Sequence, residues 1–250
     1  MTLIARTAAT LALGTLIGAA SAATVHVRFD NPIFSGVPAP AYDNVTITFP
    51  APVGGGSSTV STAAGRFQGT GSNVVGVDPA IFVDGLDDLF MYCYDVYEHV
   101  GSGWQADYTI RFDGESLRTL DFLGAVNAVL NQRRSTNDPY AWLHPLNGFE
   151  AAAVQLGIWE SKYDSSGWSL GSGSFRAGNV DAGTALELNA YFGAIPSTAA
   201  LDGRFVMTLE AHGVQDMITG DPPARVPEPG TLALAAVAGA ALWRRRRTRG

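Results

Sequence analysis

The sequence predicts an α+β domain, built as a β-sandwich or open β-barrel with a helical insertion. Three observations predict it: period-two alternation occurs early and late in the chain, helical periodicity is confined to the middle, and 29 glycines and 13 prolines supply turns. The chain has 250 residues, of which 46% are hydrophobic and 16% are charged. A chain of this length and composition can bury a sizeable core and is not intrinsically disordered.

Strand patterns flank the middle of the chain. Residues 25–29 and 45–49 alternate between apolar and polar side chains, as half-buried antiparallel strands do. Two later strands are indicated by apolar side chains at every second position, namely Trp104, Ala106, Tyr108, Ile110 and Phe112, and then Phe205, Met207, Leu209 and Ala211. The stretch 54–76 is rich in Gly, Ser and Thr, so we expect a long loop or an irregular hairpin there.

Two helices are indicated between these strands. The first has Ser116 as its N-cap and stops before Pro139, and its predicted shared face comprises Leu117, Leu120, Leu123, Asn127 and Leu130. The second begins at Asn147, with Glu150 three residues on, a spacing similar to a capping box. Because residues 151–159 are apolar on nearly every face, we expect this helix to be buried.

The N-terminal segment has the features of a secretory signal peptide. Arg6 precedes an apolar stretch, and Ala20-Ser21-Ala22 fits the small-residue cleavage site of signal peptidase. We therefore expect residues 1–22 to be removed after Ala22, leaving a domain over residues 23–219 and a linker over residues 220–226.

The C-terminal segment, residues 227–250, combines three features in a fixed order. Pro227, Glu228 and Pro229 precede a 13-residue apolar run, which an arginine cluster follows. This order resembles the PEP-CTERM sorting signal. The resemblance implies transient insertion of this segment in the inner membrane as a transmembrane helix, cleavage by exosortase near Pro227 to Pro229, and release to the cell surface or extracellular matrix. The apolar run is shorter than the ~20 residues that span a bilayer comfortably.

The charge balance excludes nucleic acid as a partner. Between the two terminal segments the chain has 10 basic and 22 acidic residues, a net charge of −12, which repels phosphate backbones. The four histidines are scattered without a metal-binding spacing, so we expect no metal and no cofactor. Lys162 is the single lysine, which argues against a stalk stapled by isopeptide bonds.

Two residues in the middle of the chain, Cys93 and Gln155, each lack an evident partner in the sequence. Cys93 is the single cysteine of an exported chain and therefore has no disulfide partner within it. Gln155 lies in the helix expected to be buried, where an unpaired side-chain amide costs about 1 to 3 kcal/mol. On these residues alone, Cys93 is a small buried hydrophobe and Gln155 bonds to a neighbouring backbone.

Taken together, the segments around these residues resemble the thioester domain of bacterial surface adhesins. The matching segments are Tyr92-Cys93-Tyr94-Asp95 and Val154-Gln155-Leu156-Gly157-Ile158-Trp159, with Val154 and Gly157 where the adhesin pattern often has Thr and Ala. The resemblance implies a covalent bond between the side chains of Cys93 and Gln155, formed with loss of ammonia. Shielding of this bond from water is expected of three aromatic side chains, Tyr92, Tyr94 and Trp159. Four residues are candidates for a general base by type alone, namely Asp95, His99, His144 and Glu160.

The function expected from these features is covalent adhesion rather than enzymatic turnover. An internal thioester would capture an amine or hydroxyl of a surface protein or glycan. A second interpretation is a structural protein of an exopolysaccharide or biofilm matrix in which Cys93 is a buried free thiol. A third is a noncovalent carbohydrate-binding β-sandwich that uses exposed Trp104, Trp142 or Trp168 as stacking platforms.

Overall fold

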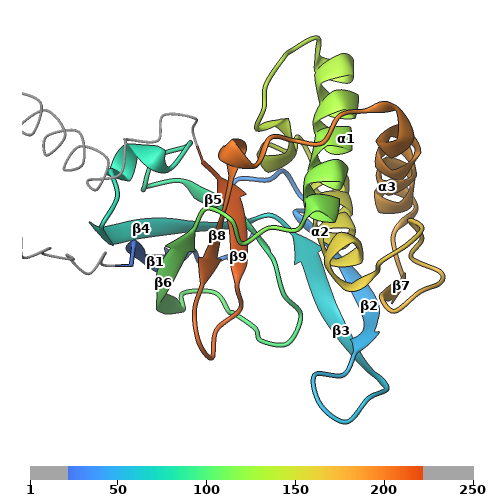
Figure 1. Cartoon of the computed structure of the whole chain (residues 1–250), viewed down its shortest axis with the longest axis horizontal. Coiled ribbons are helices and arrows are strands. Elements are labelled where there is room, and N and C mark those ends of the chain that lie inside the picture. Colours follow the sequence, from blue (N-terminus) through green and yellow to red (C-terminus); the bar gives the residue numbers. More distant parts are fainter. Residues whose placement is uncertain (1–21, 222–250) are drawn as a thin grey trace, which may run out of the picture.

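The computed structural model describes residues 22–221 (Figure 1). Six antiparallel strands form a closed barrel in the order β1 (Thr24–Phe29), β4 (Phe67–Val75), β5 (Leu89–Cys93), β9 (Met217–Gly220), β8 (Val206–Glu210) and β6 (Gln105–Arg111). A separate three-stranded sheet has the order β3 (Ser57–Gly65), β2 (Tyr42–Pro50) and β7 (Arg176–Gly178). The α+β class is therefore confirmed.

The barrel is closed, whereas the sequence predicted an open barrel or a sandwich. Strand β1 pairs with a neighbour on both sides, so that Val27 lies opposite Gly71 of β4 and Ala106 of β6. Both edges of β1 are thus used, and closure leaves no free edge in this sheet. Pairings between strands so far apart in the sequence leave no signal in local periodicity.

The stretch 54–76 contains two nine-residue strands, so its assignment as a loop or irregular hairpin was wrong. The inward positions of β4 are Phe67, Gly69 and Gly71, and glycine gives no hydrophobic alternation. Glycine is required at position 69, because a Cβ there would lie 2.7 Å from the carbonyl oxygen of Arg28 on β1. Strand β3 shows no alternation because seven of its nine residues are exposed or partly exposed.

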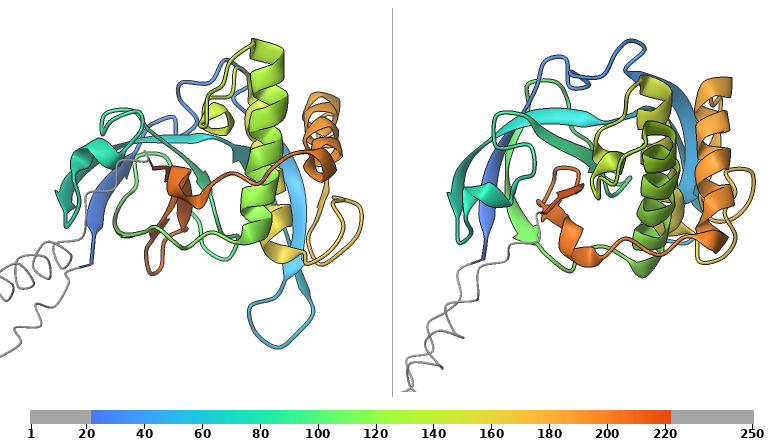
Figure 2. Two further views of the ribbon diagram at one scale, coloured as in Figure 1. Left: turned by 45° about the horizontal axis from the view of Figure 1, so that its top comes forward. Right: turned by 90° about the horizontal axis from the view of Figure 1, so that it is seen from above.

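Three α-helices gather at one end of the barrel, beside the β2–β3 hairpin (Figure 2). They are α1 (Leu117–Arg134), α2 (Gly148–Tyr163) and α3 (Ala182–Ala194). Short 3₁₀ turns occupy Pro79–Ile81, Ala141–Leu143, Ile195–Ser197 and Gly203–Phe205. The first two α-helices were predicted, but α3 was not. Helix α2 contacts α1, α3, β2, β3 and β5, which explains why a helix apolar on nearly every face is stable here.

The helix ends follow the predicted capping residues. The Ser116 side chain accepts a hydrogen bond from the backbone of Thr119, and the Asn147 side chain accepts one from the backbone of Glu150. Helix α1 ends at Arg134, with Arg133 and Arg134 in its last turn, just before the segment Asn137-Asp138-Pro139 that was expected to stop it. The predicted face of α1 contains one error, since Leu117 in the first turn is 81% exposed.

The folded part of the chain extends slightly beyond the predicted boundary at residue 219. Gly220 belongs to β9, and the buried Asp221 donates its backbone N–H to the carbonyl of Phe205. The signal segment before Ala22 and the sorting segment that contains Pro227, Glu228 and Pro229 lie outside the described residues. Within residues 22–221 no helix is both long and apolar enough to cross a membrane.

Candidate functional site

The structure brings Cys93 and Gln155 together across 62 residues of sequence. The Gln155 Oε1 atom accepts a hydrogen bond from the Cys93 backbone N–H at 2.9 Å, and Gln155 Nε2 donates to the Cys93 carbonyl at 2.8 Å. The amide therefore pairs with Cys93 as a neighbouring strand would. Both residues are buried, Gln155 completely. The predicted solution for a buried amide, a hydrogen bond to nearby backbone, is thus present.

Two packing features hold Gln155 against the last residue of β5. The capped N-terminus of α2 is fixed by Glu150, whose carboxylate pairs with Arg134 at 2.6 Å and accepts the Leu146 N–H at 2.8 Å. Further along α2, Phe122 of α1 lies against Gly157, where an added Cβ would be 1.9 Å from the ring. The small residue lets α1 and α2 approach closely.

The environment of Cys93 keeps its thiol protonated. Burial raises the pKa of the thiol well above its ordinary value, and the nearby Asp95 carboxylate raises the pKa further. Since the thiolate is the nucleophilic form, this setting lowers the reactivity of the Cys93 thiol toward external reagents.

The three aromatic residues expected to shield the site are all buried. Trp159 lines the same cavity as Cys93 and donates its indole N–H to the carbonyl of Asp95 at 3.1 Å. Tyr92 directly precedes Cys93 on β5, where successive side chains point to opposite faces, and its hydroxyl donates to the Trp142 carbonyl. The Tyr94 hydroxyl accepts the Ser116 N–H at 2.8 Å. Trp159 is therefore the best placed of the three to cover the thiol.

A cavity of about 490 Å³ extends from Cys93 between the β2–β3 hairpin and the segment 96–100. Its apolar wall includes Ile47, Phe67 and Trp159, all at most 5% exposed. The volume lies within the ~300–1,000 Å³ of small-molecule sites. The cavity thus reaches the residue that bears the thiol.

The four candidate bases are dispersed. His99 lines the cavity that Cys93 lines. His144 bonds instead to Asp84 at 2.9 Å, and Glu160 accepts the Ser169 N–H at 3.0 Å. The Asp95 carboxylate accepts three backbone N–H groups, those of Tyr97, Glu98 and Asp216. Of the four, His99 alone shares the cavity of the thiol.

Sequence reasoning missed Gln215. Its side chain lines the cavity and donates from Nε2 to the Asp95 carbonyl at 2.8 Å, beside the bond from Trp159. These two donors hold the backbone just after Cys93. No local sequence signal marks Gln215, because the contact joins segments 120 residues apart.

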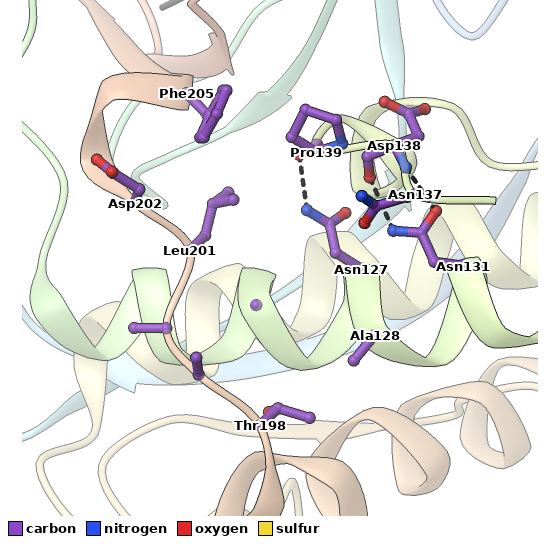
Figure 3. A pocket seen from close by; sticks show the side chains of 13 residues that line it. Asn127, Ala128, Asn131, Asn137, Asp138, Pro139, Thr198, Leu201, Asp202 and Phe205 are labelled. Atoms are coloured by element: carbon purple, nitrogen blue, oxygen red, sulfur yellow. Dashed lines mark hydrogen bonds between the residues drawn. The ribbon is translucent and has the colours of Figure 1, made fainter.

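A second cavity, of about 590 Å³, lies beside α1 and is not linked to this chemistry (Figure 3). Asn127 and Asn131 point into it from α1, but their amides donate to the carbonyls of Pro139 and Asp138 at 2.6 and 2.8 Å. Asn127 Oδ1 also accepts the backbone N–H of Trp142. These side chains anchor the segment that follows α1.

Two of the three tryptophans proposed as stacking platforms pack against other residues of the protein. Trp142 is completely buried, so its assignment as exposed was wrong. Trp168 stacks on Phe122 and carries the Arg118 guanidinium 3.6 Å from its ring centroid. Trp104 is 46% exposed, as that interpretation requires.

Glu160 gives the fold a testable pH dependence. Burial raises the pKa of its carboxyl to about 7, with Asp164 adding to the rise while the Ser169 N–H and Arg118 oppose it. The folded chain thus holds this proton more tightly than the unfolded chain, whose glutamate pKa is near 4.5. The free energy of unfolding should therefore fall as pH rises from about 4.5 to about 7.

Urea titrations across this pH range measure the effect. Glu160→Gln keeps an acceptor for the Ser169 N–H and should flatten the dependence. An unchanged slope in Glu160→Gln would assign the dependence to other groups.

Comparison with known proteins identifies the C-terminal segment. Residues 225–247 match the PEP-CTERM protein-sorting motif. The motif implies an exported protein that exosortase processes and that is sorted to the cell surface or matrix. No curated protein and no solved structure matches the chain.

Proposed function

We propose that this protein is a surface adhesin in which Cys93 and Gln155 form an internal thioester that captures a surface nucleophile. The observation that carries the proposal is the two-point pairing of the Gln155 amide with the Cys93 backbone. It holds the thiol-bearing residue and the carboxamide in fixed register. Such preorganisation lowers the barrier of an intramolecular reaction.

The pairing also suggests how ring closure proceeds. The Cys93 sulfur attacks Gln155 Cδ, and the developing charge on Oε1 is stabilised by the Cys93 N–H that already donates to this oxygen at 2.9 Å. The C–N bond breaks, the thiol proton passes to the departing nitrogen, and ammonia leaves. Attack by an amine or hydroxyl then yields an amide or ester and regenerates the thiol, so each molecule reacts once rather than turning over.

The mass of the purified mature protein tests this proposal. It should be lower than the sequence mass by one ammonia, a difference that a buried free thiol does not produce. Methylamine should add at Gln155 and release the Cys93 thiol. Cys93→Ala is the matched control and should have its full sequence mass and ignore methylamine. A full sequence mass with one titratable thiol in the unfolded wild type contradicts the thioester.

One alternative is favoured by a specific observation. Hydrogen bonding satisfies the Gln155 amide without a covalent bond, and burial raises the pKa of the Cys93 thiol. Both fit a structural matrix protein with an inert free cysteine. The same mass measurement separates this alternative from the adhesin.

Processing of the sorting segment is tested independently. Protein recovered from the cell surface should end near Pro227 to Pro229, and a strain without exosortase should keep the arginine cluster in its membranes. Replacing Pro227, Glu228 and Pro229 with alanine should block this cleavage but leave signal-peptide removal after Ala22 unchanged. Surface protein that retains Trp243 would identify the segment as a permanent anchor.

A further inference from the structure

The cavity that Cys93 lines is flanked by every exposed aromatic side chain within residues 22–221. Tyr97, 45% exposed, lines the cavity itself. Trp104, 46% exposed, packs 5.2 Å from the ring of His99, which lines it. Tyr42, 41% exposed, packs 4.8 Å from the ring of Phe34, which also lines it. The large exposed apolar side chains in the rest of this region are aliphatic.

The polar side chains of the cavity include hydroxyls, an amide, the Glu98 carboxylate and the His99 imidazole. Thr62 of β3 contributes a hydroxyl that has no hydrogen-bond partner within the described part of the chain. Glu98 and His99 line the opposite side, and Glu98 Oε1 accepts the Gly213 N–H at 2.9 Å. The lining includes no lysine or arginine. A phosphate, sulfate or carboxylate would therefore find no lysine or arginine here.

We propose that this cavity binds a neutral hexose unit of an oligosaccharide. A sugar ring has an apolar face of C–H groups and a belt of hydroxyls, which match the exposed aromatic rings and the polar side chains of the cavity. Tyr97 and Trp104 supply the stacking surface, and Thr62 and Glu98 supply hydrogen bonds.

The inner end of the cavity favours a hydroxyl over an amine as the group that reaches Cys93. Its walls are apolar, and the same burial already raises the pKa of the thiol. Bringing an ammonium group into such a site costs far more than bringing in a neutral hydroxyl. Covalent capture of the sugar rests on the proposed thioester. In this step the sugar oxygen bonds to Gln155 Cδ, the C–S bond breaks, and the hydroxyl proton passes to the Cys93 sulfur.

The test separates sugar binding from the thioester by using Cys93→Ala, which cannot form the bond. Calorimetry with maltohexaose, cellohexaose and mannohexaose measures binding, with hexagalacturonate and a lysine-containing hexapeptide as competing ligand classes. We expect at least one neutral hexaose to bind, and Tyr97→Ala and Trp104→Ala in this background to weaken binding about tenfold. Leu186→Ala, which removes an exposed side chain on α3, is the matched control and should bind unchanged.

Three results would overturn the sugar site: no binding of any neutral hexaose, binding that both aromatic substitutions leave unchanged, or preferential binding of the acidic hexaose or the peptide. Equal melting temperatures of the variants show that they are folded. Wild-type protein shown by mass to contain the thioester should also gain the mass of the bound hexaose. If it gains methylamine but never the hexaose, the hydroxyl acceptor is wrong while the thioester stands.

Discussion

Gln155→Ala is expected to lower the free energy of unfolding by about 3 kcal/mol or more. In the form before ring closure, the substitution leaves the buried N–H and C=O of Cys93 without partners, which costs about 1 to 3 kcal/mol, and opens a cavity in the core, which adds about 2 kcal/mol or more. Urea denaturation followed by tryptophan fluorescence measures the change. A loss below about 1 kcal/mol would mean that the amide pairing contributes little.

Comparing Cys93→Ala with Gln155→Ala tests whether the side chains of the two residues are crosslinked. It keeps the backbone groups that pair with Gln155, so its cost reports mainly on the side-chain bond. A crosslink that closes a 62-residue loop contributes about 4 kcal/mol by the chain-entropy account used for disulfides, whereas losing a free buried sulfur costs about 1 kcal/mol. With the crosslink, the double variant should lose less than the two single variants combined, because both remove the same bond.

Gly157→Ala is expected to destabilise the protein by about 3 kcal/mol, although alanine is the better helix former. The added methyl would sit 1.9 Å from the Phe122 ring, so α1 and α2 must separate or the ring must move within a packed core. Phe122→Leu in the same chain should recover part of the loss by vacating that space. The melting temperatures of the single and double variants measure both effects.

A matched control exists on α3. Gly193 is exposed and has open space around its Cα, so Gly193→Ala should leave stability unchanged or raise it by up to about 1 kcal/mol. Equal effects at Gly157 and Gly193 would contradict the steric account. The same steric account explains why this chain has glycine at position 157, where the adhesin pattern often has alanine: the Phe122 ring fills the space that a Cβ would need.

The sequence predicted the elements whose cause is local. The caps at Ser116 and Asn147 and the burial of α2 follow from residue type and spacing along a few turns. The same reasoning failed for β4, because its inward positions 69 and 71 are glycines that serve the neighbouring strand β1. Local reasoning also failed for Trp142, because tryptophan occurs both on surfaces and in cores. Its burial depends on contacts with distant residues such as Tyr92.

By itself, the sequence determined the sorting segment and the pair of residues that define the candidate site. A sorting motif is a linear pattern, and Cys93 and Gln155 stand out because each is costly or unusual where it lies. Tertiary structure alone decided that the barrel closes, that Gln155 pairs with the Cys93 backbone, and that a cavity flanked by exposed aromatic side chains extends to Cys93. Each depends on contacts between segments far apart in the chain, and local propensity carries no information about such contacts.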